Sequence, residues 1–307
     1  GLIISAAAVN AMRRDVLNQL TALRARRADY PINPPKSVPD YRGSKELPGL
    51  TVQVTTREQL TPNLLNSETA MLYVPLHILA ADPEMTSLLV KRGRLAVVLP
   101  RIVHDGEMPK LRKDLAMLQS IGVKNALVGN LGLLAPAREA GMRLHGDFGL
   151  NIYNSVSMNV LRSLEVCSAL VSFEMTLPQI RDLSKAVNAE ILAYGRMPLM
   201  ITEQCLIQGR TGECTCHLGS TKLTDKTGAE FPILKDGNSC RSVLFNGKKL
   251  SWLDRQDDLA KLGVWAIRLY FTTENAREVD RVLEDYLNPA PFDPGACTRG
   301  LYLRGVE

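Results

Sequence analysis

Short β-branched runs alternate with segments of helical periodicity along most of this chain, and this alternation limits the possible folds more than any other feature. Eight runs have the length and the aliphatic content of buried strands. They are Thr51–Thr56, Met71–Leu76, Leu95–Pro100, Asn125–Gly129, Arg143–Phe148, Ser168–Phe173, Ala189–Tyr194 and Val264–Phe271. Helical patterns such as Met108–Ile121 lie between most of them. The sequence therefore predicts an α/β fold, a (β/α)8 TIM-like barrel, with an open doubly wound sheet as the alternative.

The interval between the seventh and eighth runs is much longer than the others and predicts an insertion at residues 196–255. In a barrel, the loop after a strand lies at the C-terminal face, where active sites are built. We therefore expect the insertion to project from that face. Its many glycines indicate an irregular, loop-like segment.

Four of the six cysteines lie in this insertion: Cys205, Cys214, Cys216 and Cys240. Four thiolates can converge on one soft metal centre, either Zn²⁺ or a [4Fe–4S] cluster. Their spacing, Cys-x8-Cys-x-Cys-x23-Cys, contains one close pair, whereas structural zinc sites usually have two Cys-x2–4-Cys knuckles. His217 is an alternative ligand, and the simpler interpretation is that some of the four are buried apolar residues.

The residues before the barrel predict a separate organisation. Residues 1–30 form an amphipathic helix, interpreted as the end of a preceding domain, because apolar side chains recur at intervals of three and four. Closely spaced prolines then predict a linker at residues 31–48. The barrel domain is expected to occupy residues 49–307.

Charge and hydropathy set limits on partners and location. The chain has 37 basic and 32 acidic residues, a net charge of +5, which permits an anionic partner without requiring one. The sequence contains no run of eighteen apolar residues that could span a membrane. The first residues are apolar but lack the basic segment of a secretory signal. We expect a cytoplasmic protein without a membrane partner.

Polar side chains that follow the predicted strands are candidates for the active site. Glu203 is two residues before Cys205, which suggests a role in proton handling or ligand orientation, with a loop salt bridge to Arg196 as the alternative. The candidate catalytic residues are Glu203, Glu174 and Arg196, and the candidate substrate-binding residues are Arg101, Asn130, Asn151 and Asn154. The sequence contains no His-Glu-x-x-His, Gly-x-Ser-x-Gly or phosphate-binding loop motif.

Several blocks of the sequence resemble the collagenase-like peptidase family U32. The signature-like block is Tyr194–Cys205 with Gly212–Cys216, and further similar stretches are Leu150–Ser155, Phe173–Leu177, Asp225–Pro232, Cys240–Ser242, Asn246–Asp254 and Thr298–Gly300. The resemblance covers most of residues 50–307. Large members carry an earlier barrel and a middle domain, so it implies a C-terminal region whose partner is the N-terminal half of the same protein.

The resemblance implies two functions. The family name implies proteolysis, but other similar members act with an iron–sulfur cluster in oxygen-independent or prephenate-linked hydroxylation of RNA bases or quinone precursors. Their cluster ligands correspond to Cys205, Cys214, Cys216 and Cys240. We therefore expect a [4Fe–4S]-dependent enzyme that hydroxylates an RNA base or a related ring. The alternative is a collagenase-like peptidase with a peptide substrate and a structural four-cysteine metal site, for example zinc, whose full thiolate ligation leaves no open position.

Overall fold

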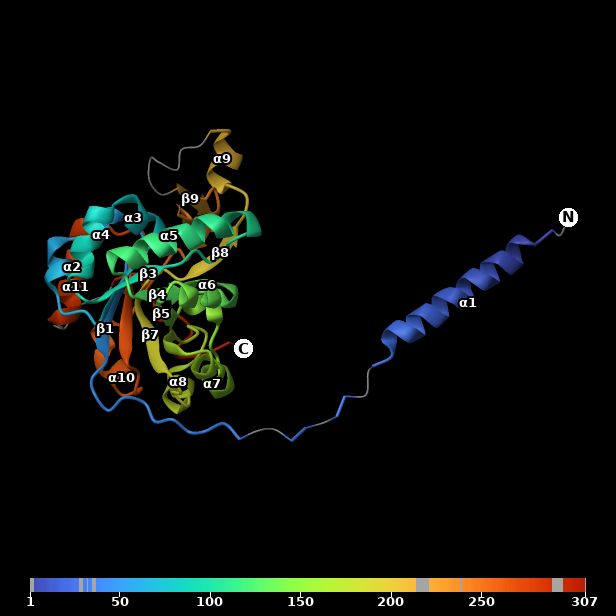
Figure 1. Cartoon of the computed structure of the whole chain (residues 1–307), viewed down its shortest axis with the longest axis horizontal. Coiled ribbons are helices and arrows are strands. Elements are labelled where there is room, and N and C mark those ends of the chain that lie inside the picture. Colours follow the sequence, from blue (N-terminus) through green and yellow to red (C-terminus); the bar gives the residue numbers. More distant parts are fainter. Residues whose placement is uncertain are drawn as a thin grey trace. The chain divides into compact units, whose positions relative to one another are not determined.

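Eight parallel strands close into a barrel in the unit formed by residues 38–307 of the computed structural model (Figure 1). The structure describes residues 3–27, 30–31, 33–34, 37–213, 221–237, 239–288 and 295–306, without the side chains of 209–211. The barrel strands are β1 (Gly49–Gln53), β2 (Met71–Pro75), β3 (Leu95–Val98), β4 (Asn125–Val128), β5 (Arg143–Gly146), β6 (Val166–Leu170), β7 (Asn188–Gly195) and β13 (Ala266–Tyr270). Because β13 pairs in parallel with both β1 and β7, the sheet is closed, and the predicted barrel is confirmed over the open sheet.

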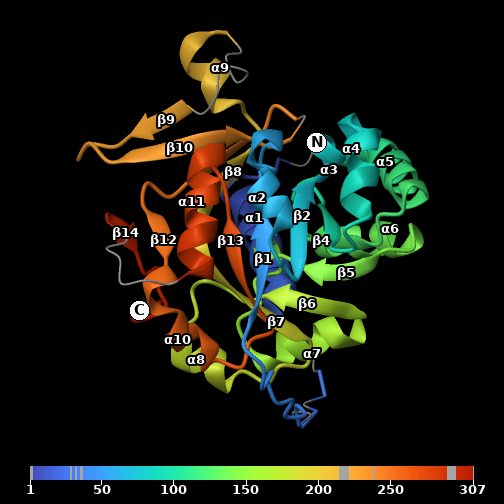
Figure 2. The ribbon, with the colours of Figure 1, turned by 90° about the vertical axis from the view of Figure 1, so that its left-hand side faces the viewer.

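Helices cover the outside of the barrel between successive strands (Figure 2). They are α2 (Pro62–Asn66), α3 (Leu76–Ala81), α4 (Pro83–Val90), α5 (Met108–Ile121), α6 (Leu134–Glu139), α7 (Ser155–Ser163), α8 (Leu177–Asp182), α10 (Gln256–Ala260) and α11 (Ala276–Leu287), with 3₁₀ turns η1 (Arg57–Gln59), η2 (Asp105–Glu107), η3 (Leu131–Leu133), η4 (Phe148–Leu150) and η6 (Leu253–Arg255). In α5, Leu111, Leu115 and Leu118 share the buried face, as a 3.6-residue period requires. The main core lies between these helices and the strands.

The inside of the barrel has a smaller apolar cluster of its own. Met71, Tyr73, Ala96 and Leu127 come from β2, β3 and β4 and pack together. Successive strand residues point to opposite faces, so the residues between them face the helices. The rest of the interior contains polar and charged side chains, which are described with the site.

The insertion after β7 is a four-stranded antiparallel sheet in the order β8-β11-β10-β9, so the loop-like prediction is wrong for most of it. Its elements are β8 (Pro198–Thr202), α9 (Leu206–Thr211), β9 (Thr221–Thr224), β10 (Glu230–Lys235) and β11 (Ser242–Phe245). Gly228 and Gly237 do lie in turns with positive φ. The chain then returns through β12 (Lys249–Ser251), antiparallel to β7 and parallel to β14 (Cys297–Thr298).

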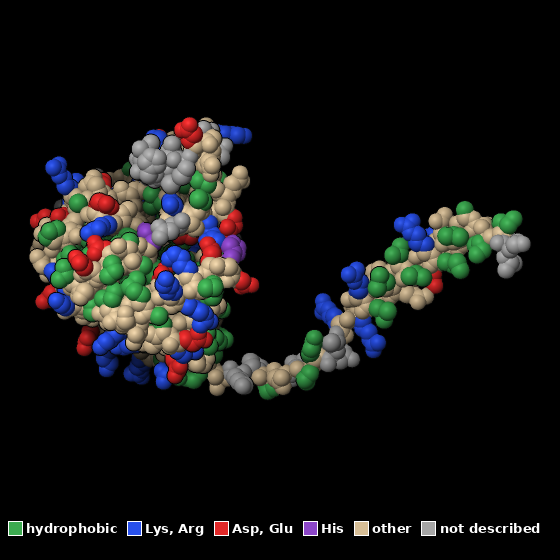
Figure 3. Space-filling model, turned by 45° about the horizontal axis from the view of Figure 1, so that its top comes forward, with side chains coloured by type: hydrophobic (Ala, Val, Ile, Leu, Met, Phe, Trp, Pro, Cys, Tyr) green, Lys and Arg blue, Asp and Glu red, His purple; other side chains and the backbone are tan. Residues whose placement is uncertain are grey.

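A second unit, residues 1–37, contains α1 (Ala6–Ala25). Ser5 begins the helix by accepting a hydrogen bond from the backbone N–H of Ala8. Every residue of α1 is exposed, and Figure 3 shows hydrophobic and basic side chains along the helix. In the described part of the chain, no helix combines the length and the apolar character needed to cross a membrane.

Candidate active site at the barrel mouth

Arg241 fastens the insertion to the C-terminal face of the barrel. Its Nε donates to Glu203 Oε1 at 2.8 Å, and its Nη2 donates to Glu107 Oε2 at 2.9 Å. Its Nη1 donates to the carbonyl oxygen of Ile102, in the loop after β3, at 3.2 Å. The guanidinium is 6% exposed, and its hydrogen bonds to Glu107 raise its pKa. Charge-assisted bonds of this kind are stronger than neutral ones, so they hold the insertion against the mouth.

Glu203 is the predicted site residue most closely tied to this junction. Besides Arg241, it contacts His104, whose Nε2 lies 3.0 Å from Glu203 Oε1. The hydrogen bond from Arg241 lowers the pKa of Glu203, so this half-exposed group is a carboxylate at neutral pH. Figure 3 shows acidic, basic and histidine side chains gathered beside the insertion.

Arg196 lies elsewhere and does not pair with Glu203. Its Nη1 donates to the carbonyl oxygens of Asn246, at 2.9 Å, and Gly247, and its Nε donates to Thr273 Oγ1 at 3.3 Å. These contacts join the end of β7 to the returning segment of the insertion and to the loop after β13.

The turn between β10 and β11 lies over the barrel mouth. A Cβ on Gly237 would lie 3.3 Å from His77 Nδ1, so the turn is in close contact with the beginning of α3. Burial lowers the pKa of His77, with a further contribution from the charge of Lys235. Burial also raises the pKa of Asp236 in the same turn. This turn leads directly to Cys240 and Arg241. We call Asp236, Gly237 and residues 239–241 the cysteine turn.

Cys205 and Cys240 lie near the same end of the β8–β11 ladder. Thr202 of β8 pairs with Ser242 of β11, and the two cysteines lie three and two residues beyond that pair. Leu206 donates its backbone N–H to Ser242 Oγ at 3.2 Å, which keeps the start of α9 beside β11. Cys205 is partly exposed and Cys240 is exposed, so neither is a buried apolar residue.

The other two cysteines of the predicted centre, Cys214 and Cys216, lie outside the described residues, as does His217. Among the residues that the structure describes, no three Cys, His, Asp or Glu side chains form a metal-binding group. A four-cysteine centre therefore requires Cys214 and Cys216. Cys167 and Cys297 are partly exposed and lie outside the insertion.

Rings and a cation lie side by side on the loops after β3, β5 and β6. The Arg101 guanidinium carbon is 4.9 Å from the Phe148 ring centroid, and Phe148 lies 5.9 Å from Phe173 at an interplanar angle of 38°. Asn130 Nδ2 donates to the Arg101 carbonyl oxygen at 3.1 Å. We call Arg101, Phe148 and Phe173 the ring platform. Arg241 binds Ile102, the neighbour of Arg101, so the platform and the cysteine turn are adjacent.

The remaining predicted site residues have different surroundings. Asn154 caps α7 by accepting from the Ser157 N–H at 2.9 Å, and Asn130 also accepts from the Gly132 N–H at 2.9 Å. Asn151 has a left-handed φ of 47° and is exposed. Glu174 is exposed beside Phe173. The structure thus brings Arg101, Asn130 and Glu203 to the junction and uses Asn154 as a helix cap.

A charged network inside the barrel was missed by the sequence predictions. Arg268 of β13 is fully buried, and its Nη1 donates to Asp147 Oδ1 at 2.6 Å and to Gln53 Oε1 at 2.9 Å. Its Nη2 binds Glu190 of β7, and its guanidinium lies 4.5 Å from the Tyr73 ring centroid. The sequence feature that could have predicted this network is a charged residue within an apolar strand run, as at Glu190 and Arg268. Asp147, at the end of β5, connects this network to the mouth.

Neighbouring interior groups remain neutral. Burial lowers the pKa of His145 to about 4, with contributions from the charges of Arg143 and Arg268. His145 Nδ1 lies 2.7 Å from Ser168 Oγ, so this serine–histidine pair is enclosed in the barrel. The buried Tyr73 hydroxyl and Arg268 Nε make no hydrogen bond of normal geometry within the described ranges.

Comparison with known proteins finds a curated relative and several solved structures that this chain is similar to. The chain is 24% identical over 124 residues to an uncharacterized protease of Methanocaldococcus jannaschii, a match that covers 37% of this chain and 30% of that protein. The matched segment thus spans less than a third of the curated relative. Similar solved structures include the U32 peptidase Mk0906, with a TM-score of 0.46, 9% identity, and coverage of 77% of this chain and 98% of that chain. Another is the tryptophan synthase α-subunit of Pyrococcus furiosus, with a TM-score of 0.46, 10% identity, and coverage of 80% and 99%.

The family comparison extends over most of the barrel. The model of peptidase family U32 matches residues 83–288, from α4 to the end of α11 and including the insertion. Since this match covers well over half of the sequence, the chain belongs to peptidase family U32.

Proposed function

We propose that this chain is the cluster-bearing part of a cytoplasmic enzyme that hydroxylates an RNA base or a related ring. Cys205, Cys214, Cys216 and Cys240 would hold a [4Fe–4S] cluster at the barrel mouth. One observation carries the proposal: Arg241, next to Cys240, binds the backbone of Ile102, next to Arg101 of the ring platform. A ring-binding surface and the cysteine turn are therefore neighbours.

The described donors fit such a group in chemistry and accessibility. Thiolates are the usual ligands of iron–sulfur clusters, and both described cysteines reach the surface near the same end of one β-ladder. When bound, the cluster supplies one-electron transfer. A zinc ion held by the same four thiolates would instead be structural, because its coordination would be complete.

The residues of this chain would bind and orient the ring. Phe148 and Phe173 offer aromatic faces, and Arg101 adds a cation that can stack on a base or pair with a phosphate. Glu174, Asn130 and Asn151 lie on the loops around this platform and are proposed to bind polar groups of the substrate. Arg196 and Asn154 would support the site by holding the loops on which it depends.

Glu203 would orient the cysteine ligands of the cluster, in addition to any contact with the ring. It is bound to Arg241 and lies two residues before Cys205, so it connects the two described cysteine positions. A carboxylate that orients metal ligands in this way affects both affinity and reactivity of the centre. The N-terminal half implied by the resemblance would be the further partner of this chain.

The second candidate is a collagenase-like peptidase with a structural four-cysteine site. It is favoured by the exposed His104–Glu203 pair, whose atoms lie 3.0 Å apart at the mouth. An imidazole held by a carboxylate can activate water for peptide hydrolysis. The enclosed His145–Ser168 pair does not offer this, because both side chains are buried.

An activity comparison in the full-length protein separates the two candidates. RNA from cells lacking the gene, and from cells complemented with wild type or variants, would be analysed by mass spectrometry for a base that gains about 16 Da, the mass of one oxygen atom. We expect complementation by wild type and by Cys297→Ser, and none by Cys205→Ser or Phe148→Ala. Peptide or collagen cleavage by the purified protein, lost in His104→Ala but kept in Cys205→Ser, would instead support the peptidase.

A further inference from the structure

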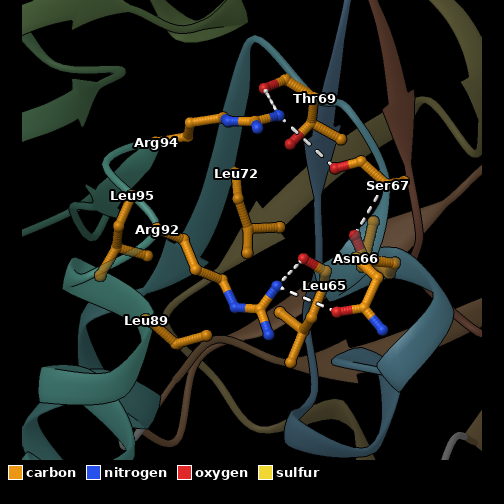
Figure 4. A pocket seen from close by; sticks show the side chains of 10 residues that line it. Leu65, Asn66, Ser67, Thr69, Leu72, Leu89, Arg92, Arg94 and Leu95 are labelled. Carbon is orange, nitrogen blue, oxygen red and sulfur yellow. Dashed lines mark hydrogen bonds between the residues drawn. The ribbon is translucent and has the colours of Figure 1, made fainter.

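Figure 4 shows a pocket lined by leucines. It lies where the chain enters β2 and β3, at the end of the barrel opposite the cysteine insertion. Its volume is about 230 Å³, and its lining comes from α2, α4, the beginnings of β2 and β3, and the connections that precede these strands. The apolar wall consists of Leu64, Leu72, Leu89 and Leu95, all buried. The pocket is separate from the site proposed above, because it is at the N-terminal face, where barrel enzymes do not place their chemistry.

Two arginines form the polar side of this pocket. In Figure 4 the side chains of Arg92 and Arg94 extend toward the α2–β2 connection on either side of Leu72. Nη1 of Arg92 donates to the Leu65 carbonyl oxygen and lies 3.3 Å from Asn66 Oδ1. Nη1 of Arg94 donates to the Thr69 carbonyl oxygen at 2.8 Å.

These contacts leave much of each guanidinium available. Nε and Nη2 of Arg92 and Arg94 make no hydrogen bond with any atom of residues 37–213, 221–237, 239–288 and 295–306. Each guanidinium has five N–H donors in a planar fork that matches a carboxylate. Both arginines are exposed, so the open side of the pocket presents donors without a protein partner beside an apolar wall.

The charges of both arginines are also uncompensated. No Asp or Glu is among the lining residues, and Glu68 of the same connection is exposed and does not line the pocket. Neither arginine lies within 4.0 Å of a carboxylate in the described part of the chain. Arg268, in contrast, is fully buried and binds two carboxylates. Two neighbouring cations without an acidic partner attract an anion.

We infer that this pocket binds a small amphiphilic carboxylate. Its anionic head would lie on Nε and Nη2 of Arg92 and Arg94, and its short aliphatic chain would contact the four leucines. The volume is below the range of about 300–1,000 Å³ that is usual for drug-sized ligands, so the ligand is a small one. The inference does not depend on the proposed function, because no residue is shared between the two sites.

Binding of hexanoate to the wild-type protein, followed by calorimetry and by leucine methyl shifts in NMR, tests this inference. Hexanol has a similar chain without the charge, and inorganic phosphate has the charge without the chain. We expect hexanoate to bind and to shift the methyl signals of Leu72 and Leu95. It should bind at least about tenfold more tightly than hexanol, which lacks the charge-assisted bonds, and than phosphate, which leaves the leucines uncovered.

Variants show whether the arginines are responsible. Arg92→Gln/Arg94→Gln is expected to weaken hexanoate binding about tenfold or more, whereas Arg143→Gln, an exposed arginine at the same end of the barrel, should leave it unchanged. Circular dichroism and thermal unfolding verify the fold, and the single change Arg94→Gln replaces the double variant if that variant unfolds. Absence of hexanoate binding to wild type, equal binding of phosphate or hexanol, or unchanged affinity in the folded variant would overturn the inference.

Discussion

Arg268 is the residue whose charge the barrel interior depends on most. It has no exposed surface, and two carboxylates, Glu190 and Asp147, converge on it. Glu190 also accepts a hydrogen bond from Thr51. Removing the cation would leave two buried negative charges without a partner, which proteins tolerate poorly.

We therefore predict that Arg268→Met lowers the free energy of unfolding by about 3–5 kcal/mol, measured by urea denaturation. The exposed arginine Arg143, changed to Met, serves as the control and should alter stability by less than about 0.5 kcal/mol. The triple change Arg268→Met/Glu190→Leu/Asp147→Asn should recover part of the loss. An Arg268→Met protein as stable as wild type would show that the network does not hold the barrel together.

His145 gives a prediction about pH. Its pKa is about 4 in the folded chain and about 6.5 in an unfolded one, so the unfolded state binds the proton more tightly. The free energy of unfolding should therefore fall as the pH falls from about 6.5 toward about 4. Urea midpoints at several pH values would show a shallower fall in His145→Gln than in wild type. Parallel curves for the two proteins would contradict the assignment.

At the scale of elements, the barrel strands could be predicted, but the strands within the insertion could not. Runs such as Val264–Phe271 are apolar because both faces of a parallel barrel are buried. Such a continuous apolar run can be recognised in the sequence without knowing which strands lie beside it. The strands of the insertion lack it. They are short and mostly only partly buried or exposed, and Pro232 lies within β10, so composition suggested a loop.

Arg241 joins the insertion to the β3–α5 loop through both Glu107 and the Ile102 backbone, beside the contact between Glu203 and His104. We predict that Arg241→Gln increases hydrogen exchange in residues 102–107 and 236–242. The melting temperature of the barrel should change little, because Val103 is the one described residue of these segments that packs against the barrel core. Arg112→Gln, which removes an exposed ion pair with Glu139, is the matched control. Unchanged exchange at both segments would mean that other contacts hold the insertion.

Two glycines test the packing of the mouth loops. A Cβ on Gly149 would clash with the Gly129 carbonyl oxygen, whereas a Cβ on Gly106 meets no atom within 4 Å. Gly149→Ala should therefore destabilise the chain by about 1–3 kcal/mol and displace Phe148 from Arg101, and Gly106→Ala should not. Thermal unfolding measures the first effect. Equal stability of the two variants would show that the loops can separate without cost.

At the scale of the whole molecule, the position of the site was predictable but its internal partners were not. An insertion after the seventh strand must lie at the C-terminal face, so the cysteine segment and the strand-end residues could be assigned to one region. The direction in which Glu190 or Arg268 points depends on strand register, which a single sequence does not give. The alternative interpretation of Glu203 paired it with Arg196, whereas its partners are His104 and Arg241, the second of which precedes a strand pairing that was not predicted.

The central claim is that four cysteines hold an iron–sulfur cluster beside the ring platform. Iron and acid-labile sulfide, measured in anaerobically purified full-length protein, test it most directly. We predict about four iron and four sulfide per chain, lost in each of Cys205→Ser, Cys214→Ser, Cys216→Ser and Cys240→Ser and retained in Cys297→Ser. Stoichiometric zinc without sulfide in the wild type, or unchanged iron in all four variants, would contradict it.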